Sequence, residues 1–131
     1  MKELYNIGIC EKTLKSMMGV NPELSELSDK EIKEKEKILK DNNCSDNQVL
    51  NIISSNSLFL NRTNGEINKL ICYLKETGFT CLNILFDSNP YILNLEVFEI
   101  KNYIDVRLNN GEELDDIVDD LDSNPLLFQE M

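Results

Sequence analysis

The sequence predicts an all-α protein, a small α-solenoid of about three and a half two-helix repeats of 33–35 residues. Asparagine recurs at positions 21, 56, 89 and 124, and three of these four residues precede the three prolines of the chain. Gly8, Asn43, Gly78 and Gly111 form a second series with the same spacing. Apolar residues between the two series follow the helical period, and no segment of comparable length alternates as a strand does.

The two series also set the domain organisation. At 131 residues the chain has the length of one domain, which we assign to residues 1–131. The repeats cover approximately residues 4–38, 39–73 and 74–107, followed by a half repeat over residues 108–131. With 41% hydrophobic residues, close to the average for globular proteins, the chain can bury a core despite its net charge of −11.

The series that begins at Gly8 marks the ends of helices. A helix commonly ends at a residue in the left-handed conformation, where glycine is preferred and asparagine is the usual substitute. We therefore expect one helix to end before each of these four positions and another to begin after it. Residues 45–48 have the pattern of a capping box, which supports a helix start directly after Asn43.

The Asn-Pro dipeptides mark a different boundary. Proline restricts the preceding residue to extended conformations and is favoured at the first position of a helix, whereas asparagine is a good N-cap. We therefore expect each Asn-Pro to start a short turn of helix, with the asparagine side chain as its cap.

A second long helix is predicted in each repeat. Its expected starts are Ser28, Thr63 and Glu96, and each of them precedes a glutamate by three residues. The first two have the pattern of a capping box. Apolar residues inside this helix recur with the helical period in the inner copies, which predicts that one face is buried.

The first copy of this helix differs from the inner ones. It has Lys35 and Glu36 at the positions where the next copy has Leu70 and Ile71. Terminal repeats of a solenoid need a polar outer face, because no further repeat covers them. We therefore expect residues 31–39 to form a polar N-terminal cap.

The repeat unit resembles the mitochondrial transcription termination factor family. The residues that carry the resemblance are Leu74–Phe79 followed by Asn89–Leu93, with weaker copies at residues 39–60 and 111–128. The chain resembles a prokaryotic or phage member of this family. The resemblance implies an α-solenoid curved into a partial ring, whose concave side commonly holds nucleic acid in family members. The chain departs from the family in having fewer repeats and in lacking a basic inner surface.

The negative charge is concentrated at the C-terminal end. Residues 1–40 carry eight basic and eight acidic residues, whereas residues 105–131 carry Arg107 alone against nine acidic residues. We expect a helix over residues 113–121 whose apolar stripe faces inward. The acidic residues that then cover its remaining surface are Glu112, Glu113, Asp115, Asp116, Asp119, Asp120 and Asp122.

This acidic surface has two interpretations. It can be a solvated end cap that prevents stacking and aggregation. Alternatively it binds a protein with a basic surface, so that the chain acts as a nucleic-acid mimic, a regulator or a phage-encoded inhibitor of a nucleic-acid-binding protein. Phe128, which follows two leucines in the open last repeat, is then part of the contact, and a homodimer through this C-terminal tail is a further alternative.

Nucleic-acid binding is the alternative function. It would depend on Lys30, Lys33, Lys37 and Lys40, which recur along one predicted helix. Glutamates are interleaved with these lysines, and a net charge of −11 disfavours binding to phosphate.

Catalysis and cofactors are not predicted. The chain has no histidine, and its four cysteines form no C-x-x-C pair. Asp120, Asp122 and Asn124 have the spacing of a calcium loop, but Pro125 stands where the loop needs glycine and Met131 where it needs glutamate. No apolar run reaches the ~20 residues of a membrane span. We therefore expect a non-enzymatic cytoplasmic protein with no catalytic residue, metal site, cofactor or membrane partner.

Overall fold

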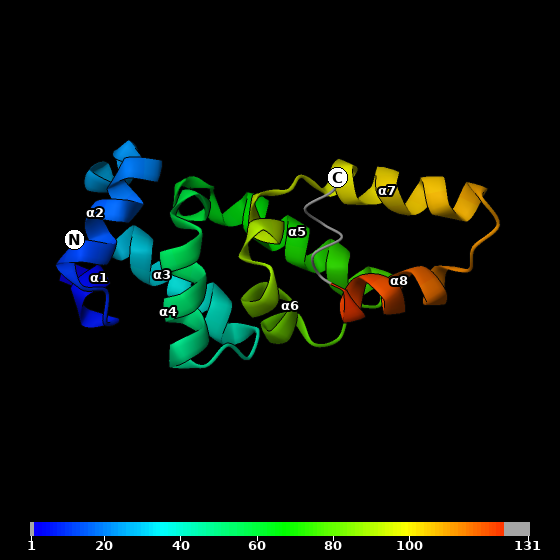
Figure 1. Ribbon diagram of the computed structural model, residues 1–131, viewed down its shortest axis with the longest axis horizontal. Helices are drawn as coiled ribbons and strands as arrows, with labels where there is room; N and C mark the ends of the chain where they lie inside the picture. Colours follow the sequence, from blue (N-terminus) through cyan, green and yellow to red (C-terminus); the bar gives the residue numbers. More distant parts are fainter. Residues whose placement is uncertain (1, 125–131) are drawn as a thin grey trace.

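The computed structural model describes residues 2–124, and its helices follow one another along the long axis of the molecule (Figure 1). The described part contains α-helices and 3-10 helices and no strand, which confirms the all-α prediction. The α-helices are α1 (Lys2–Asn6), α2 (Glu11–Val20), α3 (Asp29–Asp41), α4 (Asp46–Ser55), α5 (Asn64–Thr77), α6 (Leu82–Ser88), α7 (Val97–Asn109) and α8 (Leu114–Ser123). The 3-10 helices are η1 (Pro22–Glu26), η2 (Ser57–Asn61) and η3 (Pro90–Asn94).

The repeating unit has three elements: a first helix, a five-residue 3-10 helix and a longer second helix. It occurs as α2-η1-α3, α4-η2-α5 and α6-η3-α7, and α8 is the first helix of the next unit. Corresponding elements contact one another in neighbouring units, such as α2 with α4, α3 with α5, and η1 with η2. This nearest-neighbour stacking is the packing of a solenoid.

Four residues in the left-handed region end the long helices where the sequence predicted. The φ angles are 106° at Gly8, 72° at Asn43, 121° at Gly78 and 93° at Gly111. In each case the next residue donates its backbone N–H to a carbonyl five residues earlier, at 3.0–3.2 Å. This is the hydrogen bond of a Schellman motif, so one turn chemistry closes all four helices.

The side chains at the two ends of that hydrogen bond show where the repeat changes. In the first three copies both are buried and apolar: Leu4 with Ile9, Leu39 with Cys44, and Leu74 with Phe79. An apolar contact at these positions is a regular part of the motif. In the last copy the pair is Arg107 and Glu112, whose side chains form an ion pair at 2.6 Å.

The expected polar N-terminal cap is not present. Lys35 and Glu36 are 4% and 7% exposed, so both are buried. Glu36 is covered because α1 packs on α3 in the place of a preceding repeat, whereas Lys35 faces α5 of the next repeat. Lys35 Nζ donates to Asn64 Oδ1 at 2.7 Å, and burial lowers the pKa of Lys35.

Asn21 and Asn89, the Asn-Pro asparagines that precede a described 3-10 helix, do not cap it, contrary to the prediction. The side chain of Asn21 reaches into the next repeat instead. Its Nδ2 donates to the carbonyl of Ser57 at 3.1 Å and to Asn61 Oδ1 at 3.0 Å, and Asn61 Nδ2 donates back at 2.8 Å. We call this reciprocal arrangement an asparagine bridge.

The asparagine bridge recurs one repeat later. Asn56 Nδ2 donates to the carbonyl of Pro90 at 2.8 Å and to Asn94 Oδ1 at 3.1 Å, and Asn94 donates back at 2.9 Å. Asn89 occupies the corresponding position in the third repeat and is fully buried. Asn21 and Asn56 of the asparagine series therefore join neighbouring repeats, whereas Asn124 donates to Asp120 at the end of its own helix α8.

Replacing Asn56 by alanine should destabilise the protein by about 2 kcal/mol, because polar groups of the neighbouring repeat lose their partner. The matched control is Asn47→Ala, on the exposed first turn of α4, which should change the free energy of unfolding by less than about 0.5 kcal/mol. Urea unfolding followed by circular dichroism measures both. Equal midpoints for the two variants would show that the bridge contributes no stability.

Candidate functional site

The predicted acidic surface lies on α8 and in the turn before it. Ile117, Val118 and Leu121 are buried, as the apolar stripe predicted. Five of the predicted acidic residues are exposed: Glu112, which pairs with Arg107, and Glu113, Asp115, Asp116 and Asp119, which we call the acidic face. None of these four forms an ion pair with the residues that the structure describes.

Arg107 binds two of the remaining predicted residues. Its Nε and Nη2 donate to both carboxylate oxygens of Glu112, at 2.9 and 2.6 Å, and its Nη1 donates to Asp120 Oδ2 at 2.8 Å. The guanidinium also lies 5.7 Å from the centre of the Tyr103 ring. These hydrogen bonds lower the pKa of Glu112 and join α7 to α8. Glu112 and Asp120 are thus engaged within the protein.

The charge on α8 is unfavourable in the isolated chain. Burial, and then the neighbouring Asp119, raise the pKa of Asp122. Asp119 and Asp122 lie towards the negative end of the helix dipole, and no basic residue occupies the last turn of α8. Asp115 and Asp119 are also like charges one turn apart. A cation at this surface would relieve the repulsion between these like charges, although Asp115 and Asp116 in the first turn also gain from the positive end of the dipole.

Phe128 and the two leucines before it lie outside the described residues. The calcium-like spacing at Asp120 and Asp122 corresponds to an ordinary helix end, where Asn124 Nδ2 donates to the carbonyl and side chain of Asp120 at 3.3 and 3.2 Å. In residues 2–124 there is no group of three His, Cys, Asp or Glu side chains that could hold a metal ion.

The predicted lysines are distributed along α3. Lys30, Lys33 and Lys37 are exposed and line a shallow groove together with Glu34. Lys37 Nζ lies 3.4 Å from Asp41, and Lys40 Nζ lies 3.0 Å from Asp46. Such exposed ion pairs are weak. Another anion can therefore bind Lys37 and Lys40, in competition with Asp41 and Asp46.

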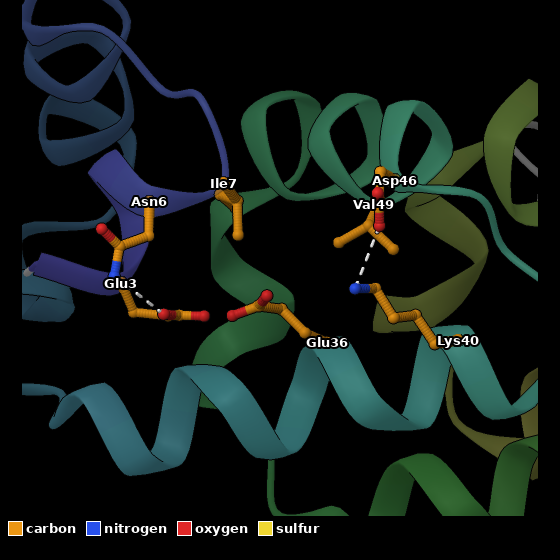
Figure 2. A pocket seen from close by; sticks show the side chains of 7 residues that line it. All are labelled: Glu3, Asn6, Ile7, Glu36, Lys40, Asp46 and Val49. Carbon is orange, nitrogen blue, oxygen red and sulfur yellow. Dashed lines mark hydrogen bonds and ion pairs between the residues drawn. The ribbon is translucent and has the colours of Figure 1, made fainter.

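A pocket that sequence reasoning missed lies between α1, α3 and α4 (Figure 2). It is a cavity of about 280 Å³ lined by Glu3, Asn6, Ile7, Glu36, Lys40, Asp46 and Val49. Figure 2 shows that the carboxyl groups of Glu3 and Glu36 point toward one another from facing helices. Both residues are buried, and Glu36 Oε2 has no hydrogen-bond partner among the described residues.

The two carboxyl groups differ in their affinity for a proton. Burial, and then the facing Glu3 side chain, raise the pKa of Glu36 to about 8. A hydrogen bond from Glu36 lowers the pKa of Glu3, and Asn6 Nδ2 also donates to Glu3 Oε1 at 3.3 Å. The pair therefore shares one proton near neutral pH, with Glu36 as the acid and Glu3 as the carboxylate.

The sequence does contain a signal for this pocket. Glu3 aligns with Ile38 and Tyr73 of the following repeats, and Glu36 aligns with Ile71. A carboxylate at a position that other repeats fill with apolar residues indicates a buried charge. The sequence nevertheless predicts an outer face for Lys35 and Glu36. The reason is that the five residues of α1 are too few to show a helical pattern or its packing on α3.

The stacked helical units, closed by one recurring turn and joined by asparagine bridges, define a helical-repeat protein of the α-solenoid class. The mTERF family model matches residues 1–125, so the chain belongs to the mTERF family, as the resemblance implied. No curated protein and no solved structure matches the chain. In the described residues, no helix is sufficiently long and apolar to span a bilayer.

The Glu3–Glu36 pair should make stability depend on pH. An ordinary glutamate ionises near 4.5, whereas the pKa of Glu36 in the folded protein is about 8. The folded state therefore binds more protons between these values, and stability should fall as pH rises through that window. Glu36→Gln, which keeps the shape of the protonated acid, should remove this slope.

The measurement is urea unfolding of the wild type and the variant between about pH 5 and about pH 8. Glu26→Gln, at an exposed position of η1, is the control and should keep the wild-type slope. An unchanged slope in Glu36→Gln would mean that Glu36 does not hold a proton in the folded protein.

Proposed function

We propose that the protein is a non-catalytic binding protein that engages a basic protein surface through the acidic face of α8. The observation that carries the proposal is the set of four exposed acidic residues, Glu113, Asp115, Asp116 and Asp119, without an internal cation. A nucleic-acid mimic or a regulator of a nucleic-acid-binding protein is the form of partner binding that this charge favours.

The position of Arg107 supports this proposal. It is the single basic residue of residues 105–131, and it is engaged by Glu112 and Asp120, with its side chain 18% exposed. The acidic face is therefore not neutralised from within, and the ion pairs hold α8 against α7. A fixed surface with one sign of charge accelerates the encounter with an oppositely charged partner.

The relief of unfavourable charge gives the partner its binding energy. Asp119 is a like charge one turn from Asp115. Lysine or arginine side chains of a partner would compensate this repulsion when they bind. A solvated end cap would also be acidic, but it would bind no partner. Neutralising its charge would lower solubility and leave partner capture unchanged.

The test neutralises the acidic face while it leaves the Arg107 ion pairs intact. The variant carries Glu113→Gln, Asp115→Asn, Asp116→Asn and Asp119→Asn, and the control carries the same charge change at four exposed positions, Glu11, Glu23, Glu26 and Asp41. Affinity capture from the native host, with quantitative identification, should show basic proteins that bind the wild type and the control. The acidic-face variant should lose at least about nine-tenths of them.

Equal capture by the variant and the control would refute this proposal and favour the solubilising cap. Glu113, Asp115 and Asp116 lie at the positive end of the α8 dipole, so their neutralisation should lower the urea midpoint slightly while the variant stays folded without urea. A loss of capture can therefore be separated from a loss of folding by the same unfolding experiment.

Nucleic-acid binding is the second candidate, and family membership favours it. The structural basis would be the groove on α3 that is lined by Lys30, Lys33 and Lys37. The interleaved Glu34, the ion pairs of Lys37 and Lys40, and the net charge of −11 oppose it. Binding through this groove would be weak and would depend steeply on salt.

This candidate predicts that the wild type retards duplex DNA or structured RNA at low salt in a gel. Changing Lys30, Lys33 and Lys37 to glutamate should then abolish the shift, whereas Lys12→Glu with Lys15→Glu, on exposed positions of α2, should reduce it only slightly. A wild type that retards neither nucleic acid would exclude this function.

A further inference from the structure

The cavity between α1, α3 and α4 holds a feature that the proposed function does not use. Glu36 lines this cavity and is 7% exposed, and within residues 2–124 its Oε2 has no donor except the proton that it can share with the facing carboxyl group of Glu3 (Figure 2). A buried acceptor without a partner is costly in a folded protein and needs a separate explanation. We propose that this cavity binds a primary ammonium group on a short alkyl chain, held between the carboxylates of Glu3 and Glu36.

The two carboxyl groups in the wall can accept hydrogen bonds from an ammonium group. A primary ammonium has three N–H bonds and accepts none. The wall offers the facing carboxyl groups of Glu3 and Glu36, and the Asn6 amide is engaged with Glu3, because its Nδ2 donates to Glu3 Oε1 at 3.3 Å. Figure 2 shows the two carboxyl groups facing one another, whereas the amide oxygen of Asn6 points away from them.

The rest of the wall favours an organic amine over an inorganic ion. Ile7 and Val49 contribute apolar surface, against which an alkyl stem can pack while its charged end meets the carboxylates. The cavity of about 280 Å³ is several times the ~30 Å³ that a water molecule occupies in the liquid. In the described residues, no group of three His, Cys, Asp or Glu side chains could hold a metal ion at this pocket or elsewhere.

An ammonium group inside the protein already lies at the edge of this site. Lys40 lines the cavity, but its Nζ is bound to Asp46 at 3.0 Å, on the far side from Glu3 in Figure 2. Asp46 thereby keeps Lys40 from occupying the position between the two carboxylates. An external ammonium is then the group that can fill it.

Binding of the ammonium must release a proton. Without a cation Glu3 and Glu36 share one proton, because two adjacent carboxylates cannot both be charged in a buried site. The other charged groups that act on the pair are Asp29, Lys33 and Lys40 on α3, and Asp46 of α4 faces Lys40. With an ammonium in place both carboxyl groups are ionised, and the proton goes to solvent.

The experiment is calorimetric titration of the full chain with n-butylammonium chloride in buffers of different ionisation enthalpy. Binding should release about one proton near pH 7 and should tighten about tenfold between about pH 6 and about pH 7. Glu36→Gln should weaken binding at least about tenfold, because it keeps the fold but cannot become negative. Glu26→Gln is the matched control and should bind as the wild type does.

A second variant tests the role of Lys40 independently. In Asp46→Asn, Lys40 loses its carboxylate partner and can turn to Glu36, so n-butylammonium should bind several-fold more weakly. The pKa of Glu36, followed by carbon NMR of its carboxyl group, should fall in this variant. An unchanged pKa together with unchanged binding would show that Lys40 does not compete for the site.

Three results with n-butylammonium would overturn the proposal. They are equal binding by Glu36→Gln and the wild type, binding without proton release, and competition by potassium, magnesium or tetramethylammonium at the same concentration as n-butylammonium. Putrescine and Nα-acetyl-lysine methylamide distinguish the two natural sources of the group, a free polyamine and a lysine side chain. Tighter binding of one identifies the source, and failure of both would also overturn the proposal.

Discussion

The asparagine bridge is the interaction on which the rest of the structure depends. Each unit must turn from an α-helix into a 3-10 helix through an extended asparagine, and that turn is buried. The backbone around such a turn has polar groups that helical hydrogen bonds do not satisfy. Asn21 and Asn56 satisfy carbonyls of the following unit, and Asn61 and Asn94 satisfy the asparagines in return. A unit separated from its neighbour would expose or strand these groups, so the stack is cooperative through polar as well as apolar contacts.

The two ends of the described stack depart from this regular pattern in the same way, by placing charge at positions that are apolar in the inner units. At the C-terminal end Arg107 and Glu112 replace the apolar pair of the Schellman motif. At the N-terminal end Glu3 and Glu36 replace residues equivalent to Ile38 and Ile71. The first replacement is a complete ion pair near the surface and joins two helices. The second is a buried pair of like groups and is balanced only by a proton or a cation.

The parts of this fold that the sequence predicted are those with a local cause. The left-handed residues, the apolar stripe of α8 and the caps at Ser45 and Thr63 follow from chemistry within a few residues. The destination of the Asn21 side chain could not be predicted in this way, because its partner Asn61 belongs to the next unit. A local window favours a cap, since asparagine is a good N-cap in isolation. The buried position of Glu36 likewise depends on α1, whose five residues carry little helical pattern of their own.

The acidic face and the Glu3–Glu36 pair both contribute to a net charge of −11, yet they differ in the range over which they act. Charges on the acidic face are exposed, and their field extends to a partner before contact, within the ~8 Å screening length of physiological salt. The Glu36 carboxyl group is buried, so salt screens it little and only a group that enters the cavity can pair with it. One set of acids therefore favours encounter with a large cationic surface, and the other selects a single cation by shape and hydrogen bonding. The acidic residues of this small solenoid therefore do not all act in the same way. Exposed carboxylates attract a cationic surface, whereas a buried carboxyl group pairs with a single cation.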